Sequence, residues 1–263
     1  MPRVRLDSLL TERGLFESRT RAAAAVLAGD VRIGAGGRRA EKAAQLVDAD
    51  VELVVEARPP YVSRGGVKLA NALDALGLDV AGRRGLDVGA STGGFTDCLL
   101  RRGASQVVAL DVAYGELDYR LRSDARVTVL ERVNARSLEC TALPFAPDVV
   151  VADVSFISLR KVLPAVLGCC AERFDCLAMA KPQFEVGRAR VGKGGVVRDP
   201  ALRREAVASV AECGRSLGCA VMGFASSGLP GPAGNLETFV WLAEGARGGG
   251  VADVEAALAG AGA

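Results

Sequence analysis

Seven short apolar segments constrain the fold of this chain more than any other feature. They are rich in Val, Leu and Ala, and segments with helical patterns separate them. Strand-length apolar runs that alternate with helices predict right-handed crossovers and a doubly wound, mostly parallel sheet. The expected strands span residues 85–89, 107–112, 127–133, 148–154, 174–180, 220–225 and 236–242. An α/β fold with a seven-stranded sheet is therefore predicted.

A Pro- and Gly-rich stretch divides the chain near residue 60. Residues 57–66 read ARPPYVSRGG, which can continue neither a helix nor a central strand. At 263 residues the chain is long enough for one large and one small domain. We expect a small domain, a linker, a large domain and a flexible Gly- and Ala-rich tail. Their predicted bounds are residues 1–57, 58–67, 68–245 and 246–263.

The predicted small domain combines two short helices with short strands. Leu6 and Leu10 indicate a helix that breaks at Gly14, and Ser18 is the N-cap candidate of a second helix. Residues 1–42 carry nine basic side chains and five acidic ones. For a small α+β module with arginines on a helix face, a solvated surface and an RNA-contacting surface are equally good interpretations.

The composition narrows the possible chemistry. The chain contains no His, which excludes imidazole bases and His-ligated metals. Its seven Cys form no C-x-x-C pair and mostly lie in apolar stretches, so we expect reduced core thiols and no metal site. Residues 1–17 lack an unbroken apolar stretch, and no segment reaches the ~18 apolar residues of a membrane helix. A cytoplasmic protein without membrane contact is predicted.

The sharpest local motif is LDVGASTGGF at residues 86–95, where an apolar strand breaks into a Gly-rich turn that opens a helix. Such a turn lets the backbone approach a ligand closely. It lacks the G-x-G-x-x-G spacing of dinucleotide sites, and Asp87 stands where an anion would be repelled. S-adenosylmethionine, a zwitterionic nucleoside, fits better. The candidate cofactor-binding residues are Asp87, Gly89, Ala90, Ser91, Thr92, Gly93, Gly94, Phe95, Asp111, Asn134 and Asp153.

Two of these candidates lie at the ends of later strands. Asp111 ends the second strand of the large domain, where a carboxylate commonly bridges ribose hydroxyls. Asn134 follows the third and could reach an adenine edge. Taken alone, Asp111 is also an ordinary turn residue.

Four ionisable side chains are expected to converge beside the turn. Asp153 ends the fourth strand, Lys181 ends the fifth, Glu237 opens the last, and Lys68 precedes the first apolar helix of the large domain. They suit methyl transfer to a hydroxyl, because a lysine held by carboxylates can accept or orient the hydroxyl proton. A purely structural ion pair between Asp153 and Lys181 is the simpler alternative.

Other methyl acceptors fit these residues less well. Carbon-5 methylation of a pyrimidine needs a Cys nucleophile after the fourth strand, but residues 153–156 read DVSF. Methylation of an exocyclic amine prefers an Asn/Asp-Pro-Pro-aromatic turn at the same place. The similar RPPY at residues 58–61 begins with Arg and lies in the predicted linker.

Taken together, these motifs resemble the TlyA, or hemolysin A, family from Arg3 to Leu242. They are RLD at 5–7 with SR at 18–19, SRGGVKL at 63–69, the Gly-rich turn, ADVSFISL at 152–159, KPQFEVG at 181–187 and GGVVRD at 194–199. The resemblance implies an S4-like RNA-binding domain followed by an FtsJ-like, Rossmann-like class I methyltransferase. It further implies 2′-O-methylation of cytidine in 16S and/or 23S ribosomal RNA, with Lys181 activating the hydroxyl within a tetrad. The tetrad falls on Lys68, Asp153, Lys181 and Glu237.

The resemblance also implies an enzyme that binds ribosomal RNA or ribosomal subunits, and we expect this enzyme to be a monomer. Basic side chains on the small domain, at the junction and in residues 187–198 are expected to contact phosphates. They are Arg5, Arg19, Arg21, Arg64, Arg188, Arg190, Lys193 and Arg198. Two other function classes stay open. One is a non-catalytic rRNA-binding or assembly protein, and the other is a membrane-acting haemolysin, for which we see no amphipathic basic segment or export signal.

Overall fold

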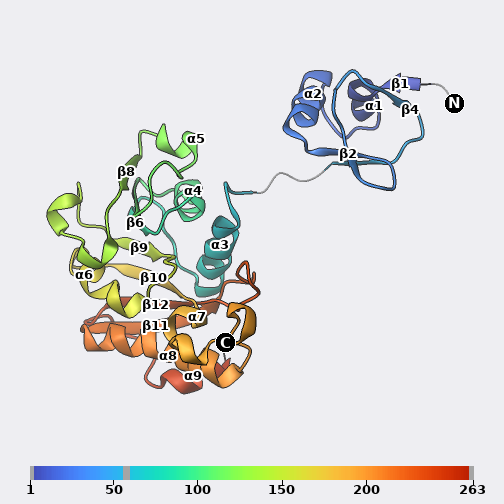
Figure 1. Cartoon of the computed structure of the whole chain (residues 1–263). Coiled ribbons are helices and arrows are strands. Elements are labelled where there is room, and N and C mark those ends of the chain that lie inside the picture. The colour runs from blue at the N-terminus through green and yellow to red at the C-terminus, as the bar shows by residue number, and fades with distance from the viewer. Residues whose placement is uncertain (1–2, 56–59, 261–263) are drawn as a thin grey trace. The chain divides into compact units, whose positions relative to one another are not determined.

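The computed structural model describes residues 3–55 and 60–260 (Figure 1). The chain divides into two compact units, Met1–Pro59 and Pro60–Ala263. Each unit has its own apolar core. Within the described ranges, no helix is long and apolar enough to cross a membrane.

The first unit packs two helices against short strands. Ser18 begins the second helix as predicted, because its side chain accepts a hydrogen bond from the backbone N–H of Arg21. Leu6, Leu10 and Val26 are buried in the core of this unit. Strand β1 pairs with β4, and β2 lies between β3 and β5, all antiparallel. The elements are β1 (Arg3–Arg5), α1 (Leu6–Glu12), α2 (Arg19–Ala28), β2 (Val31–Ile33), β3 (Arg38–Arg39), β4 (Leu46–Asp48) and β5 (Leu53–Val55).

The second unit contains the predicted seven-stranded sheet. The strand order is β11-β12-β10-β9-β6-β7-β8. The five strands from β10 to β8 run parallel, whereas β12 pairs antiparallel with both β10 and β11. The strands are β6 (Arg84–Val88), β7 (Gln106–Asp111), β8 (Val127–Glu131), β9 (Val149–Ala152), β10 (Asp175–Ala180), β11 (Cys219–Ser226) and β12 (Thr238–Glu244). The prediction of a mostly parallel, Rossmann-like sheet is confirmed.

Helices cover both faces of this sheet (Figure 1). Alternate residues of the central strands enter different cores: Val149 and Val151 pack toward α3 and α4, whereas Val150 and Ala152 pack toward α6 and α8. Strands buried on both faces explain the continuous apolar runs in the sequence. The helices are α3 (Arg64–Leu76), α4 (Gly94–Arg101), α5 (Tyr119–Arg122), α6 (Leu163–Leu167), α7 (Pro182–Glu185), α8 (Pro200–Ser216) and α9 (Val254–Gly260). Short 3-10 turns are η1 (Ala135–Ser137), η2 (Cys140–Ala142), η3 (Leu159–Lys161), η4 (Arg188–Arg190) and η5 (Lys193–Gly195).

The described structure differs from the predicted linker and tail at two places. Helix α3 begins at Arg64, inside the predicted linker of residues 58–67, and residues 58–59 of that linker lie outside the described residues. The predicted tail at 246–263 is not a free segment up to residue 260. Its helix α9 buries Leu258 in the core, and the N–H of Val251 donates to the backbone oxygen of Val221 at 2.7 Å. The Gly-rich composition hid two apolar side chains spaced four residues apart, Val254 and Leu258, which share one helix face.

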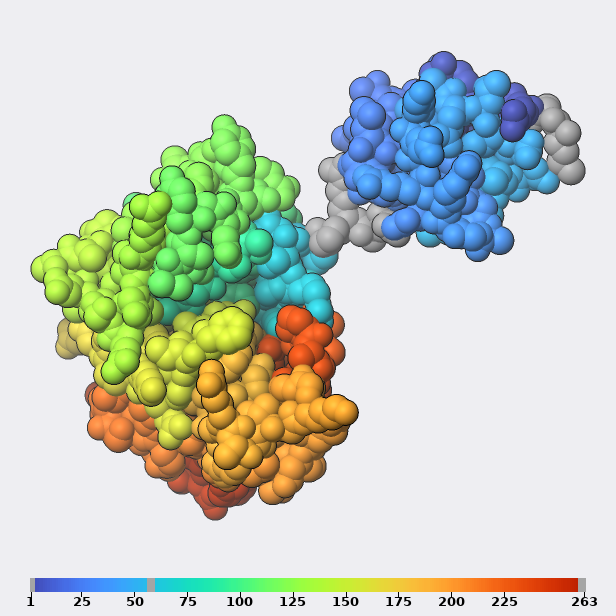
Figure 2. Space-filling view, viewed as in Figure 1, coloured from blue at the N-terminus to red at the C-terminus, as the bar shows by residue number. Residues whose placement is uncertain are grey.

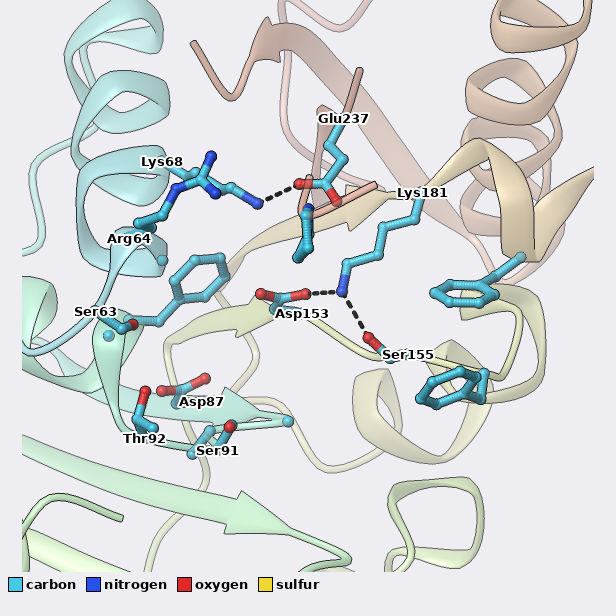
Figure 3. Close-up of a pocket in the computed structure, with 18 of the residues that line it drawn as sticks. Ser63, Arg64, Lys68, Asp87, Ser91, Thr92, Asp153, Ser155, Lys181 and Glu237 are labelled. Carbon is cyan, nitrogen blue, oxygen red and sulfur yellow. Dashed lines mark hydrogen bonds and ion pairs between the residues drawn. The ribbon is translucent and has the colours of Figure 1, made fainter. Parts of the chain in front are cut away.

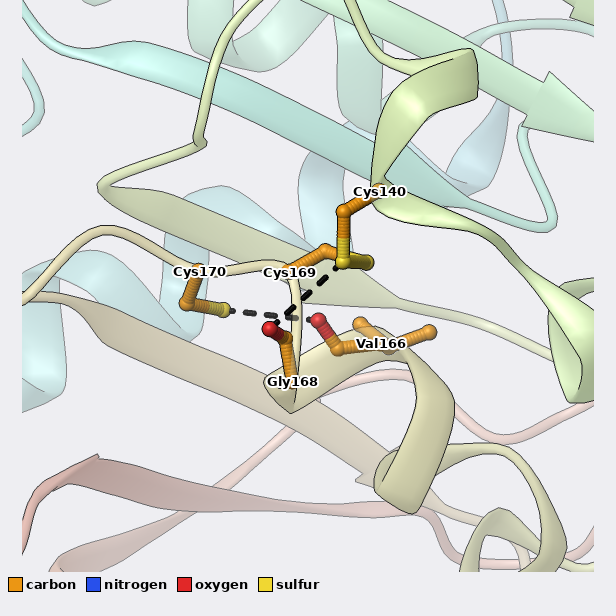
Figure 4. The surroundings of a disulfide bond; sticks show 5 residues. All are labelled: Cys140, Val166, Gly168, Cys169 and Cys170. Carbon is orange, nitrogen blue, oxygen red and sulfur yellow. Dashed lines mark hydrogen bonds between the residues drawn. A yellow bond between two sulfur atoms is a disulfide. The ribbon is translucent and has the colours of Figure 1, made fainter.

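The prediction that all cysteines are reduced thiols is wrong for two of them. Cys140 and Cys169 form a disulfide, with their Cα atoms 4.9 Å apart (Figure 4). The bond joins η2 to the segment that follows α6, and no spacing rule could reveal a tertiary contact of this kind. Of the five free cysteines, Cys170 has a pKa raised to about 12 by burial, which keeps it a thiol.

Candidate active site

A cavity opens at the carboxyl ends of the parallel strands in the second unit, where doubly wound sheets usually bind ligands. Its volume is about 560 Å³. It is lined by residues from the start of α3, from the loops after β6, β9 and β10, and from the segment before β12. All four members of the predicted tetrad line it: Lys68, Asp153, Lys181 and Glu237.

The four ionisable side chains form two separate ion pairs (Figure 3). Lys68 pairs with Glu237, and their side chains are 8% and 1% exposed. Lys181 pairs with Asp153, and these side chains are 11% and 24% exposed. A buried charge is costly unless an opposite charge accompanies it, so each lysine depends on its carboxylate. The Asp153–Lys181 pair considered as a structural alternative exists, and it forms part of the cavity wall.

Local sequence explains the position of each charged group. Lys181 directly follows β10 and precedes Pro182 at the start of α7, so the strand must end there. Asp153 directly follows β9, the neighbour of β10 in the sheet, so both side chains emerge at the same edge. Lys68 lies in the first turns of α3, and Glu237 immediately precedes β12.

The Gly-rich turn brings the backbone of β6 close to the cavity. Gly89 has φ +86°, and a Cβ atom there would lie only 2.4 Å from the backbone oxygen of Asp153. Gly93, with φ +93°, is the N-cap residue of α4. The backbone N–H of Ser91 donates to Asp111 Oδ2 at 2.7 Å, which fixes the turn against the end of β7. Glycine is therefore required where the chain turns past Asp153.

Asp87 lies beneath this turn and is fully buried. Its Oδ2 accepts hydrogen bonds from the backbone N–H of Thr96 at 2.9 Å and from the Thr96 hydroxyl at 2.7 Å. Among the described residues, Oδ1 has no hydrogen-bond partner. The pKa of Asp87 is raised to about 7, mainly by burial. The Thr96 hydrogen bonds oppose the rise, and the nearby charges of Asp153 and Asp111 add to it. An unpartnered oxygen on a cavity-lining carboxyl is suited to a ligand with a donor group.

A second cavity of about 340 Å³ adjoins the first and shares Gly89, Ser91 and Asp153 with it. Asp111 and Asn134 line it, as their places at strand ends predicted. An oxygen of each side chain already accepts a hydrogen bond from a backbone N–H group. Asp111 Oδ1 accepts from Ala113 N at 2.8 Å, and Asn134 Oδ1 caps η1 by accepting from Arg136 N at 3.0 Å.

Most of the other candidates from the turn line the larger cavity. Ala90, Thr92, Gly94 and Phe95 line the larger one, whereas Ser91 lines both. Gly93 lines neither cavity.

Sequence reasoning missed several side chains in the wall of the larger cavity. Ser155 accepts a hydrogen bond from Lys181 Nζ at 2.8 Å. Phe156 is 93% exposed and has φ +65°, a strained conformation for a residue other than glycine. Its ring lies 5.4 Å from that of Phe184, which also approaches Lys181 Nζ at 6.0 Å. The signal available in the sequence was that these residues lie just after Asp153 and Lys181, which follow β9 and β10.

Some of the basic residues predicted to contact RNA already form hydrogen bonds or ion pairs within the chain, and others do not. Arg190 pairs with Glu205, and Arg64 donates to the backbone oxygen of Pro230 at 2.6 Å. Arg188, Lys193 and Arg198 are exposed, and no hydrogen bond or ion pair of their side chains occurs in the described part of the chain. Their segment, residues 187–198, lies on the surface of the second unit, yellow to orange in Figure 2.

In the first unit, two of the three predicted arginines surround one carboxylate. Arg5 and Arg19 both bond to Asp7, at 2.8 and 3.1 Å, and the hydrogen bond from Arg5 holds the pKa of Asp7 well below its usual range. Asp7 thereby fixes two guanidinium groups that stay about half exposed. Arg21 pairs with Glu17 at the surface of α2.

Comparison with known proteins places these observations in one family. The model of the FtsJ-like methyltransferase family matches residues 61–244. The "16S/23S rRNA (cytidine-2'-O)-methyltransferase TlyA" of Mycobacterium tuberculosis is 52% identical over 91% of this chain and 90% of its own length. The chain belongs to the TlyA family.

Other TlyA-family relatives agree with this assignment. "Hemolysin A" of Brachyspira hyodysenteriae is 41% identical over 80% of this chain and 89% of its own length. The solved structure of a candidate hemolysin from Streptococcus thermophilus has a TM-score of 0.73 and 35% sequence identity, and covers 100% of this chain and 96% of that one. The chain is thus an FtsJ-like methyltransferase, whose cofactor is S-adenosylmethionine.

The residues present fit that cofactor. Gly89 closely approaches Asp153, and both residues line the two adjoining cavities, which together are large enough for a nucleoside with an amino-acid arm. Asp87 offers an unpartnered carboxyl oxygen in the larger cavity. In the smaller one, Asp111 and Asn134 provide polar edges among apolar neighbours such as Val133 and Ile157. Among the described residues, no cluster of side chains could hold a metal ion.

Proposed function

We propose that this protein methylates the ribose 2′-oxygen of a cytidine in ribosomal RNA, of the small subunit, the large subunit or both. The observation that carries the proposal is the pair of lysine–carboxylate ion pairs in one cavity wall beside the Gly-rich turn. The name of the Mycobacterium tuberculosis relative supports the same reaction and substrate. The ribosomal substrate supports a cytoplasmic location.

In this proposal Lys181 activates the 2′-hydroxyl. When bound, S-adenosylmethionine supplies an electrophilic methyl group. Once Lys181 Nζ has released one of its own protons to solvent, it accepts the hydroxyl proton as the oxygen becomes a nucleophile, and Asp153 stabilises the ammonium that results. Lys68, held by Glu237, places a second positive charge in the cavity wall, where it favours the developing negative charge on the oxygen.

The side chains around the cavity also favour a hydroxyl acceptor over a base carbon. Within the described residues, no cysteine lines either cavity, so the nucleophile required for carbon-5 methylation has no candidate there. The carboxylate–lysine pairs provide proton transfer and charge stabilisation, which an alcohol acceptor needs.

We propose that both units contribute to binding of the ribosomal RNA. The fixed arginines around Asp7 and the exposed Arg188, Lys193 and Arg198 are suited to phosphate contacts. With 5% aromatic residues, the chain offers few stacking platforms, so recognition of RNA shape and backbone is expected. We expect the protein to act as a monomer.

The test measures transfer of labelled methyl groups to ribosomal subunits that lack the modification. Wild-type protein should label the RNA, and Lys181→Ala should lose at least about 100-fold in rate. Lys161→Ala is the matched control, because Lys161 is exposed on η3 and lines neither cavity. Equal loss in both variants, or no labelling by the wild type despite intact cofactor and RNA binding, would contradict the proposal and favour a binding or assembly role.

A further inference from the structure

Among the described residues, the Lys181 amine has two polar partners, and both come from the loop after β9. It forms an ion pair with Asp153, and it donates a hydrogen bond to Ser155 Oγ at 2.8 Å (Figure 3). An amine that can accept a proton has two N–H bonds and one lone pair in a tetrahedral arrangement. When the serine oxygen takes one N–H bond and the ion pair with the carboxylate holds the amine, few directions are left for the lone pair.

The loop that carries Ser155 is fixed to the helix that follows Lys181. Buried Glu185, at the end of α7, accepts hydrogen bonds from the Leu159 N–H at 2.8 Å and from the Ser158 hydroxyl at 2.5 Å. The left-handed backbone of Phe156 turns the chain immediately after Ser155. The serine and the lysine therefore belong to two segments that are connected by a second contact, which limits how far either can shift.

We propose that Ser155 is a positioning residue that orients the Lys181 amine toward the substrate hydroxyl. This inference rests on the proposed function. Ser155 fixes one N–H bond, and the ion pair with Asp153 holds the amine from the other side, so the lone pair is directed into the cavity and receives the proton there. The new N–H bond forms as the O–H bond breaks, and Asp153 balances the positive charge. Because the serine oxygen is neutral, it supplies direction without a second negative charge beside the amine.

The first experiment compares steady-state methylation by the wild type and by Ser155→Ala. We expect kcat to fall by ~10- to 100-fold, because a misdirected base costs about this much in rate. The KM values for S-adenosylmethionine and for RNA should stay within about twofold, since the proposed role is in the chemical step. Ser155→Thr keeps the hydroxyl and should recover most of the lost kcat. Calorimetric titration with S-adenosylmethionine verifies that each variant is folded.

A double-mutant cycle tests whether Ser155 acts through Lys181. In the Lys181→Ala background, Ser155→Ala should cause no further loss, because the group that it orients is absent. Three results would each overturn the role of Ser155. They are a double variant whose loss in kcat is the product of the two single losses, a rise in KM with unchanged kcat in Ser155→Ala, and full activity of Ser155→Ala. In all three cases a wild type that forms 2′-O-methylcytidine would leave the proposed function standing, whereas a wild type without methyl transfer would overturn both.

Discussion

The Lys68–Glu237 pair gives a prediction whose size follows from burial. Glu237 is 1% exposed and Lys68 is 8% exposed, so Glu237→Leu leaves an ammonium group in a buried site without its counter-charge. Breaking a buried pair in this way typically costs ~3–5 kcal/mol of unfolding free energy. Replacing both members by apolar residues of similar volume is commonly neutral or stabilising. We therefore expect Glu237→Leu to be strongly destabilised and Lys68→Met/Glu237→Leu to regain most of the stability.

Urea unfolding monitored by tryptophan fluorescence measures this difference. The chain has one tryptophan, Trp241 in β12, so the signal reports on the second unit alone. With a urea dependence of ~2–3 kcal/mol per molar, the single variant should unfold about 1–2 M earlier than the wild type. Both variants should lose methyl transfer, because each lacks a charged group of the proposed tetrad.

The comparison of the two variants decides the outcome. A single variant as stable as the wild type would show that Lys68 finds another partner or reaches solvent. A double variant as unstable as the single one would show that packing around Glu237, and not the unpaired charge, carries the cost. Full methyl-transfer activity of the double variant would show that Lys68 and Glu237 are not needed for the proposed reaction.

Three further predictions concern the turn and the RNA-binding surface. Burial raises the pKa of Asp87 to about 7, whereas the unfolded chain releases this proton near pH 4. Between pH 4 and pH 7 the folded state therefore binds a proton that the unfolded state lacks, and the contribution of Asp87 to the free energy of unfolding falls as the pH rises. Asp87→Asn should abolish the fall, which amounts to as much as ~4 kcal/mol in urea titrations between pH 4 and pH 7. Gly89→Ala would place Cβ 2.4 Å from the Asp153 backbone oxygen at φ +86°, and calorimetry should show at least about tenfold weaker binding of S-adenosylmethionine. An unchanged affinity would mean that the turn adapts. Arg188→Ala should lower the salt dependence of RNA binding by about one unit of slope, whereas Arg190→Ala, already ion-paired within the chain, should change it less. Equal salt-dependence slopes for the two variants would show that Arg188 does not contact the RNA phosphates.

The sequence predicted the sheet and its ligand-binding edge well, for a physical reason. Strands that are buried on both faces must be apolar throughout, which makes runs such as Val149–Ala152 conspicuous. Parallel strands end at the same edge, so Asp153 and Lys181 could be placed together from strand position alone. The glycines of the turn were informative because a positive φ and a close backbone approach leave few alternatives.

The features that could not be predicted all depend on contacts between distant segments. The pairing of Lys68 with Glu237, and not with Asp153, follows from how α3 packs beside β11 and the segment before β12. The disulfide between Cys140 and Cys169 depends on the folded position of η2. Likewise, the backbone strain at Phe156 arises because the surrounding structure holds the loop in place.

The central claim is that the methyl acceptor is the ribose 2′-oxygen of a cytidine. Digestion of the enzyme-treated ribosomal RNA to nucleosides, followed by mass spectrometry, tests it most directly. The account predicts 2′-O-methylcytidine as the product with wild-type protein and its absence with Lys181→Ala. A nucleoside methylated on its base, or 2′-O-methylcytidine formed equally well by Lys181→Ala, would contradict it.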